Sequence, residues 1–210
     1  MIKLMGRVFI IFGFLMYSCG ALNKVPEVSL NGKYVSLDKV KVRISSGNFG
    51  NIALKGYISV VHDSLLCFNF NGPLGFKVLS GKFGEQFVVK DYYNDRLYND
   101  VLKELILKSG IIFNKACIEN VILSQVDSLS LQLKKLNASA IEVKTEDLGK
   151  KSTLTLLNPV KSNLFKFEFF LKKKMPREIN IFYKGSNDEW EVKIEVISLS
   201  NLKKKCNFGF

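Results

Sequence analysis

Apolar and polar residues alternate with a period of two along much of this chain. Val40, Val42 and Ile44 share one side of the first such segment, and lysine and arginine side chains occupy the other. Alternation of this kind gives a strand one buried face and one solvated face. We expect strands of this type at residues 40–44, 52–60, 65–70, 76–80 and 86–89. The turns between them are short and rich in Gly, Asn and Asp, which predicts an antiparallel meander.

The period then changes to three and four residues over residues 97–106. This spacing predicts a helix that Asn94 or Asp95 can cap and that Gly110 ends. A second, shorter helix is expected over residues 115–123. Strand patterns resume in the second half of the chain, at residues 129–133, 140–144, 152–157, 164–171, 178–183 and 190–197.

Together these patterns predict a mainly β (α+β) fold, in which a curled antiparallel sheet of about ten strands forms an incomplete barrel. The two inserted helices would close its apolar side as a lid, because that face needs a cover. An open barrel of this kind can hold a ligand cavity. The candidate lining residues are Phe68, Phe70, Phe76, Phe87, Leu102, Ile106, Phe165, Phe167 and Phe169. Ordinary core packing is the alternative for each of these phenylalanines.

The N-terminus has the pattern of an export signal. Lys3 and Arg7 precede an apolar run over residues 8–16, and the small residue Ser18 comes directly before Cys19. The run is well short of the ~20 residues that cross a bilayer as a helix. The sequence therefore predicts a secretory signal peptide.

Residues 15–19, Leu-Met-Tyr-Ser-Cys, resemble the bacterial lipobox. The resemblance implies that Cys19 is acylated and becomes the new N-terminus, and two or more acyl chains make a stable membrane anchor. We expect a lipoprotein signal peptide over residues 1–18, a tether over residues 19–38 and one soluble domain over residues 39–210. A plain signal peptide or an uncleaved N-terminal anchor is the alternative.

Composition indicates a folded, basic domain. Hydrophobic residues make up 47% of the chain and include 17 phenylalanines, which is enough for a core. The formal net charge is +12, and loss of Lys3 and Arg7 with the signal would lower it by two. A basic surface favours anionic lipid or an acidic protein as a partner, and export argues against nucleic acid.

Cysteine and histidine usage does not suggest a metal site. With Cys19 acylated, an odd number of cysteines remains, and burial as free thiols is the favoured interpretation for Cys67 and Cys117. The single histidine, His62, stands at an expected turn. We expect no metal and no cofactor. No base and no pair of carboxylates is positioned for catalysis, so we expect no enzymatic activity.

A compact motif lies in the first half of the meander. Residues 56–60 read Gly-Tyr-Ile-Ser-Val, residues 68–75 read Phe-Asn-Phe-Asn-Gly-Pro-Leu-Gly, and a leucine-rich helix that ends at Gly110 follows. In this order the elements of roughly residues 40–197 resemble LolB, a Gram-negative outer-membrane lipoprotein. They also resemble the lipoproteins of unknown function that share its half-barrel fold. LolB accepts other lipoproteins from the periplasmic carrier LolA.

The resemblance implies that Gly72, Pro73, Leu74 and Gly75 form a protruding loop that presents Leu74 to the membrane or the cargo. The residue types suit such a loop, because proline presets φ at the first central position and the flanking glycines permit a tight reversal. The alternative is that Leu74 folds back onto the sheet edge.

The resemblance further implies transfer without covalent chemistry. A monomer anchored at the periplasmic face of the outer membrane would accept acyl chains of lipids or acylated lipoproteins and pass them to the membrane, with a LolA-like carrier as a partner. Each buried methylene is worth ~0.8 kcal/mol, so a modest difference in fit sets the direction. A structural or scaffolding envelope lipoprotein of the same fold, with a filled interior and no lipid transfer, is the alternative.

Overall fold

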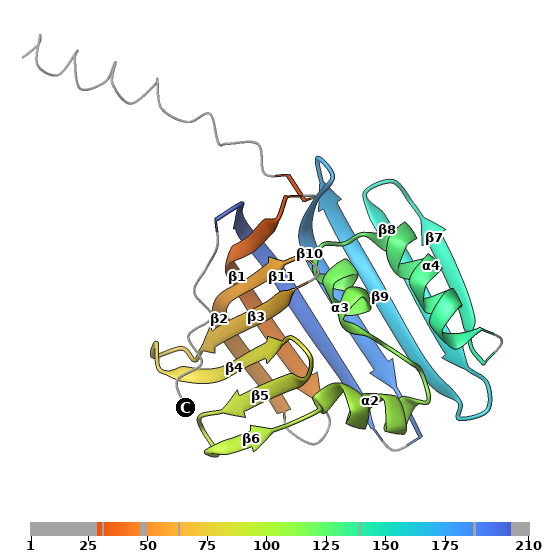
Figure 1. Ribbon diagram of the computed structural model, residues 1–210, viewed down its shortest axis with the longest axis horizontal. Coiled ribbons are helices and arrows are strands. Elements are labelled where there is room, and N and C mark those ends of the chain that lie inside the picture. Colours follow the sequence, from red (N-terminus) through yellow and green to blue (C-terminus); the bar gives the residue numbers. More distant parts are fainter. Residues whose placement is uncertain are drawn as a thin grey trace, which may run out of the picture.

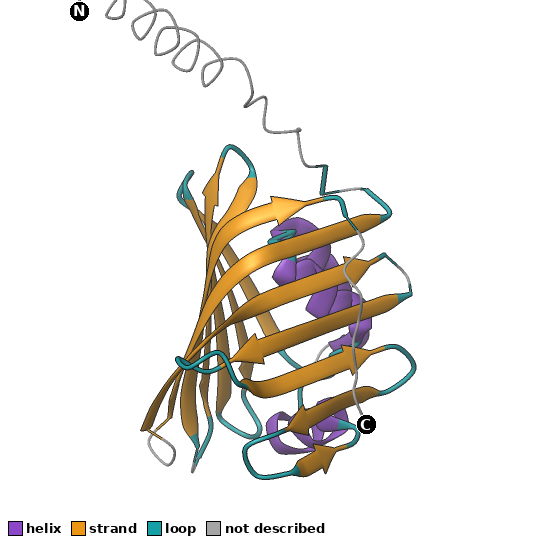
Figure 2. Cartoon of the chain, turned by 90° about the vertical axis from the view of Figure 1, so that its left-hand side faces the viewer, coloured by secondary structure: helices purple, strands orange, loops and turns teal. Residues whose placement is uncertain are grey.

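The structure, a computed structural model, describes residues 29–30, 32–46, 50–62, 64–138, 140–186 and 188–202. In this part of the chain, eleven strands form one antiparallel sheet that is not closed into a barrel, and three helices lie on its concave side (Figures 1 and 2). The predicted fold class is therefore confirmed, with one strand and one helix more than expected.

Successive strands pair with each other on both sides of a central β1–β11 pair, in the order β6-β5-β4-β3-β2-β1-β11-β10-β9-β8-β7. The strands are β1 (Tyr34–Ser46), β2 (Gly50–Val61), β3 (Leu65–Asn71), β4 (Lys77–Phe83), β5 (Phe87–Asp91), β6 (Arg96–Tyr98), β7 (Glu142–Asp147), β8 (Lys151–Asn158), β9 (Asn163–Lys172), β10 (Met175–Lys184) and β11 (Glu189–Ser200). The helices, inserted between β6 and β7, are α2 (Val101–Ser109), α3 (Lys115–Ile122) and α4 (Val126–Asn137).

Strand β9 shows how alternation builds the core. Phe165, Phe167 and Phe169 are at most 4% exposed, and their rings stack along the strand with centroids 6.0 and 6.4 Å apart. Between them, Lys166 and Glu168 are partly exposed and form an ion pair with an Nζ–Oε1 distance of 2.8 Å. The period of two thus separates an aromatic inner face from a charged outer face.

Two glycines make room for aromatic rings in the other half of the sheet. A Cβ atom at Gly81 of β4 would lie 2.3 Å from the ring of Phe68, and one at Gly56 of β2 would lie 2.7 Å from the ring of Phe70. Because no side chain stands in their way, these two rings of β3 lie over the neighbouring strands, with centroids 5.0 Å apart. Glycine is used here for close approach.

The predicted strand at residues 129–133 is wrong, because this segment belongs to α4. Its leucines alternate with polar residues, as in a strand, but Leu129 and Leu133 are fully buried while Leu131 is 73% exposed. Burial at a spacing of four residues is the helical pattern. A short alternating run inside a longer helix therefore misled the prediction.

Two predicted boundaries also differ from the structure. Residues 96–98, expected at the start of the first helix, form the edge strand β6, and the helix begins at Val101. Strand β1 begins at Tyr34, so residues 34–38 belong to the sheet and not to the tether. In both places the local sequence pattern is compatible with a strand as well as with the predicted helix or tether. Pairing with a neighbouring strand makes both segments strands.

The expectation for Cys67 is wrong as well. Cys67 is disulfide-bonded, and its partner lies outside the described residues, whereas Cys117 is a buried free thiol as expected. Burial raises the pKa of the Cys117 thiol, which keeps it protonated and unreactive. An odd cysteine count predicts that one thiol is unpaired, but it does not say which one.

Candidate functional site

The loop between β3 and β4 carries two exposed apolar side chains. Leu74 is 85% exposed and Phe76 is 73% exposed. The N–H of Gly75 donates to the carbonyl of Gly72 at 3.0 Å, and the N–H of Gly72 donates to the carbonyl of Phe76 at 3.0 Å. Gly75 has a φ of +82°, which favours glycine. The loop closes on its own backbone, so Leu74 points outward instead of folding back on the sheet edge.

Phe76 was expected to line the cavity, and the structure contradicts this. It precedes β4 and belongs to the loop, so the alternation of β4 does not turn it toward the concave side. Its exposure places a second apolar side chain beside Leu74.

The three helices cover the concave side unequally. Helices α3 and α4 each bury four residues, among them Val121 and Ile122 of α3 and Leu129 and Leu133 of α4. Helix α2 buries only Ser109, and Leu102, Leu105 and Ile106 stay partly exposed. Figure 1 shows α2 at the lower edge of the sheet, below α3 and α4, the two helices that bury more residues. Helix α2 is therefore the least buried of the three described helices.

A hollow of about 360 Å³ lies between α2 and the β4–β5 hairpin. Its apolar wall consists of Phe83, Phe87, Leu102, Ile106 and Phe113. Its polar rim consists of Glu85, Asp100, Lys103, Asn114 and Lys115. Three of the nine predicted lining residues, Phe87, Leu102 and Ile106, meet here. We call this space the inner hollow.

A second hollow of about 320 Å³ lies on the other flank of α2. Its apolar part consists of Ile44, Val101, Leu105, Tyr183 and Trp190. Its polar part consists of Ser46, Glu104, Lys108, Asp188 and Glu189. We call it the outer hollow. Since adjacent stripes of α2 line the two hollows, the helix itself is the wall between them.

The remaining predicted lining residues are core residues. Phe70, Phe165, Phe167 and Phe169 are at most 7% exposed, which agrees with the alternative of ordinary packing. Phe68 is partly exposed, and its ring makes an edge contact with the ring of Phe87, with centroids 6.3 Å apart. It therefore stands behind the wall of the inner hollow.

Sequence reasoning missed two residues of the inner hollow, Phe83 and Phe113. Phe83 lies on the same, concave-facing side of β4 as Gly81. Because Gly81 has no side chain, the alternation of apolar residues cannot be followed along the sequence as far as Phe83. Phe113 lies in the link between α2 and α3, where no periodicity applies, and its ring contacts Phe165 at 5.3 Å. The signal available in the sequence was the apolar run Ile111-Ile112-Phe113, of which Ile111 and Phe113 are buried.

The C-terminal end of α2 is firmly attached to the sheet. Asn163 donates from Nδ2 to the carbonyl oxygens of Lys108 and Ser109 at 3.1 and 3.0 Å, and Lys161 donates from Nζ to the carbonyl of Leu107 at 2.8 Å. Asn158 adds weaker contacts at 3.3 Å. These bonds satisfy carbonyls that a helix end leaves without intrahelical partners.

The N-terminal end of α2 has no comparable attachment. Asp100, which precedes the helix, has a φ of +54° and makes no side-chain capping bond. Asparagine or aspartate in the extended conformation would normally supply such a bond, and its loss costs about 1 kcal/mol. Side-chain bonds to the sheet thus lie at the C-terminal end of α2, while its N-terminal end follows β6 directly through Asn99 and Asp100.

No family model and no curated protein matches the sequence. The chain is similar to the crystal structure of a LolA superfamily protein from Nitrosomonas europaea, with 7% sequence identity and a TM-score of 0.37. The match covers 85% of this chain and 90% of that chain.

Several expectations concern the chain ends and metal binding. Cys19, the signal peptide and most of the tether lie outside the described residues. Within residues 29–202, apart from the gaps given above, no helix is long and apolar enough to cross a bilayer. In that same part of the chain, no three His, Cys, Asp or Glu side chains group as metal ligands would.

Proposed function

We propose that this protein is a lipid-anchored carrier that takes up acyl chains beneath α2 and passes them to a membrane, as the resemblance to LolB implies. The observation that carries the proposal is the pair of apolar hollows on the two flanks of α2, a helix that side chains of the β8–β9 region bond at its C-terminal end. Each hollow is at the small end of the range for ligand sites, roughly 300–1,000 Å³. An acyl chain would therefore enter as α2 swings away and the two hollows join.

The hinge of this movement would be the cluster of bonds from Asn158, Lys161 and Asn163. Displacing the rest of α2 exposes few fully buried side chains, since Ser109 alone is buried in the helix. Elements with few buried apolar contacts open at low free-energy cost. The side chains uncovered on the sheet are aromatic, and each acyl methylene buried against them contributes ~0.8 kcal/mol.

Binding fits these hollows better than catalysis. His62 contacts the carbonyl of Leu30 through Nε2 at 3.0 Å and lines neither hollow. Lys103, at the rim of the inner hollow, is placed to meet an anionic head group while the chain lies among the phenylalanines, whereas Lys115 pairs with Glu119 at 2.9 Å.

The anchor at Cys19 and the Leu74 loop are compatible with one bilayer. The tether enters at Tyr34, and the β3–β4 loop lies towards the opposite end of β2. A strand as long as β2 spans about 40 Å. Residues 20–33, fully extended, would reach at most about 46 Å. Leu74 could therefore touch the membrane that holds Cys19.

Uptake is tested by displacement of a fluorescent fatty acid from the purified full-length protein. Ile106→Trp fills the inner hollow and should weaken binding about tenfold, which corresponds to the contacts of about two methylenes. The control is Leu107→Trp on the same helix, because Leu107 is 67% exposed and its replacement should leave binding unchanged. A folded protein without displaceable binding would overturn the carrier proposal and favour the scaffold.

Delivery is tested separately at the loop. Leu74→Glu should leave folding and fatty-acid binding intact but impair the transfer of an acylated lipoprotein to vesicles. Val160→Glu is the matched control, since Val160 is 90% exposed on the β8–β9 turn. Normal transfer by Leu74→Glu would remove the loop from the mechanism.

A further inference from the structure

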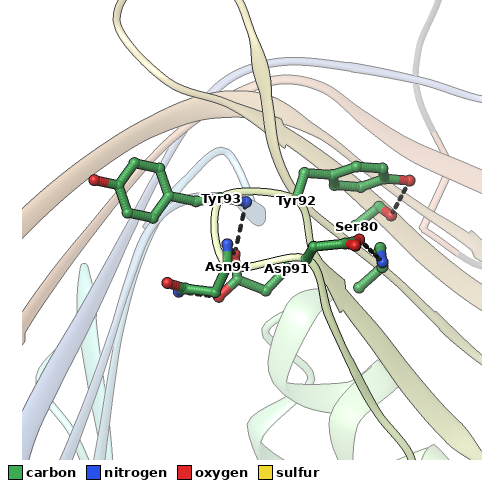
Figure 3. A network of polar contacts seen from close by, with 7 residues as sticks. Ser80, Asp91, Tyr92, Tyr93 and Asn94 are labelled. Carbon is green, nitrogen blue, oxygen red and sulfur yellow. Dashed lines mark hydrogen bonds and ion pairs between the residues drawn. The ribbon is translucent and has the colours of Figure 1, made fainter.

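The turn between β5 and β6 presents an exposed tyrosine from a stiff backbone. Asp91 accepts bonds at Oδ1 from the backbone N–H groups of Tyr93 and Asn94, at 2.9 and 3.1 Å, and at Oδ2 from the Asn94 side chain at 2.7 Å (Figure 3). Burial opposes ionisation of Asp91, but these bonds and nearby Arg96 outweigh it and lower its pKa. Tyr93 points away from this network and is 86% exposed.

The same turn is bonded to the strand that leaves the Leu74 loop. The N–H of Tyr92 donates to the carbonyl of Val78 at 2.9 Å, and Ser80 donates from Oγ to the Tyr92 hydroxyl at 3.2 Å. The ammonium of Lys77 lies 4.6 Å from the centre of the Tyr92 ring. These contacts hold the β3–β4 loop and the β5–β6 turn at the same edge of the sheet, so exposed Phe76 and exposed Tyr93 come from neighbouring segments.

We propose that Leu74, Phe76 and Tyr93 form one membrane-contacting edge, in which Phe76 and Tyr93 enter the interfacial layer of an anionic bilayer and set the depth of Leu74. This inference extends the proposed function and rests on its delivery step. We call these three residues the contact edge. Both segments that carry it lie on the left side of the molecule in Figure 1.

A bilayer suits the contact edge better than a protein partner does. Its three side chains protrude from two turns, and none of the hollows described above includes them. Protruding tips fit a deformable surface, whereas a partner helix or strand needs a groove or an open edge. Tyrosine has an apolar ring and a polar tip, which is the combination enriched where membrane meets water.

Charge around the contact edge agrees with anionic lipid. Lys77, Lys90 and Arg96 flank it, against two acidic residues, Asp91 and Asp95. Asp95 pairs with Lys90 and Asp91 is bonded within the turn, so the net charge of these five residues is +1. The whole chain carries a formal charge of +12, so anionic head groups attract it at longer range as well.

The test measures depth in the membrane, because acylation alone would hold every variant on vesicles. Full-length protein carrying Tyr93→Trp is inserted into phosphatidylcholine–phosphatidylglycerol vesicles that contain brominated lipid, and the emission of native Trp190 is subtracted. The matched control is Leu148→Trp, since Leu148 is 74% exposed on the β7–β8 turn at the opposite end of the strands. We expect quenching of the tryptophan at 93, weaker quenching without phosphatidylglycerol, and none at 148.

Adding Phe76→Ser to the Tyr93→Trp protein should reduce the quenching several-fold, because one of three anchors is lost, while adding Leu131→Ser should not. Equal accessibility of both tryptophans to aqueous acrylamide, with and without vesicles, would overturn the contact edge. Fatty-acid binding without this quenching would leave the carrier function in place and reject the edge alone. Quenching in a protein that binds no fatty acid would support the edge and reject the carrier.

Discussion

Phenylalanine side chains are buried to different extents in the two halves of the sheet. In the half formed by β7–β11, Phe165 and Phe169 are at most 1% exposed, and α3 and α4 pack above that half. In the half formed by β2–β6, Phe70 and Phe83 are buried, but Phe68 and Phe87 are partly exposed, and α2 lies beside β5 with little of its own surface buried. Phenylalanine is a packed core residue where two helices cover it and borders a hollow where a loosely attached helix does.

This difference in packing bears on which part of the continuous sheet is stable and which part can open to admit a ligand. A well-packed half resists opening, and regions that must admit a ligand come from the less stable part of a structure. The contact edge and the inner hollow belong to the second half, whereas Tyr183 and Trp190 of the first half line the outer hollow. The following predictions compare the two halves, starting with the largest expected effect.

Phe165→Ala should destabilise the protein by about 3–5 kcal/mol, the usual cost of truncating a buried aromatic ring. The ring contacts Phe113, Tyr183 and Trp190 with centroid distances of 4.7–5.9 Å. Chemical denaturation measures the loss. Phe87→Ala should cost well under half as much, because its ring already borders a hollow. Equal costs would mean that the two halves are packed alike.

Gly81→Ala should cost about 1–3 kcal/mol, since the added methyl lies 2.3 Å from the Phe68 ring and must displace it. The displaced ring should also change fatty-acid binding in the inner hollow next to Phe87. Gly84→Ala serves as the control for stability alone, because its methyl would meet only an ordinary contact at 3.9 Å to Leu65, whereas Gly84 itself lines the inner hollow. A neutral Gly81→Ala would show that Phe68 has room to move.

Asn163→Ala should cost about 1–2 kcal/mol, because it removes the shorter bonds to the Lys108 and Ser109 carbonyls and leaves Ser109 only the 3.3 Å contact with Asn158. Amide hydrogen exchange should show faster opening of α2 with α3 unchanged. Asn120→Ala breaks one bond, 3.3 Å to Gln132 between α3 and α4, and should leave exchange in α2 as it was. Unchanged protection of α2 in the first variant would rule out this hinge.

Asp91→Asn should have the smallest effect, about 1 kcal/mol or less at neutral pH. The folded-state pKa of Asp91 lies below its ordinary value of 3.8, so the charged carboxylate stabilises the fold above that value. This contribution is lost as the pH falls through the lower folded-state pKa. Amide NMR signals of Tyr93 and Asn94 should shift in that acidic range in the wild type. The variant should show no such transition.

Several features could be predicted from the sequence, and each came from a local pattern. The alternation of β9 and the helical spacing of α3 predict their buried faces correctly, since periodicity is a property of neighbouring residues. The glycines and proline of residues 72–75 predict a tight loop, and the structure has one. The boundary at β6 and the whole of α4 were missed because three to five residues can suit either period.

By itself, the sequence determined the inward and outward faces of most strands, the place of the helical insertion and the residue types on the exposed loop. Only the tertiary structure decided which phenylalanines are packed and which border the hollows, that Phe76 points to solvent, and that Cys67 is bonded. These outcomes depend on contacts between residues far apart in the chain. The bonds from Asn163 to the end of α2, between residues 54 and 55 positions apart, are one example, and no local period encodes them.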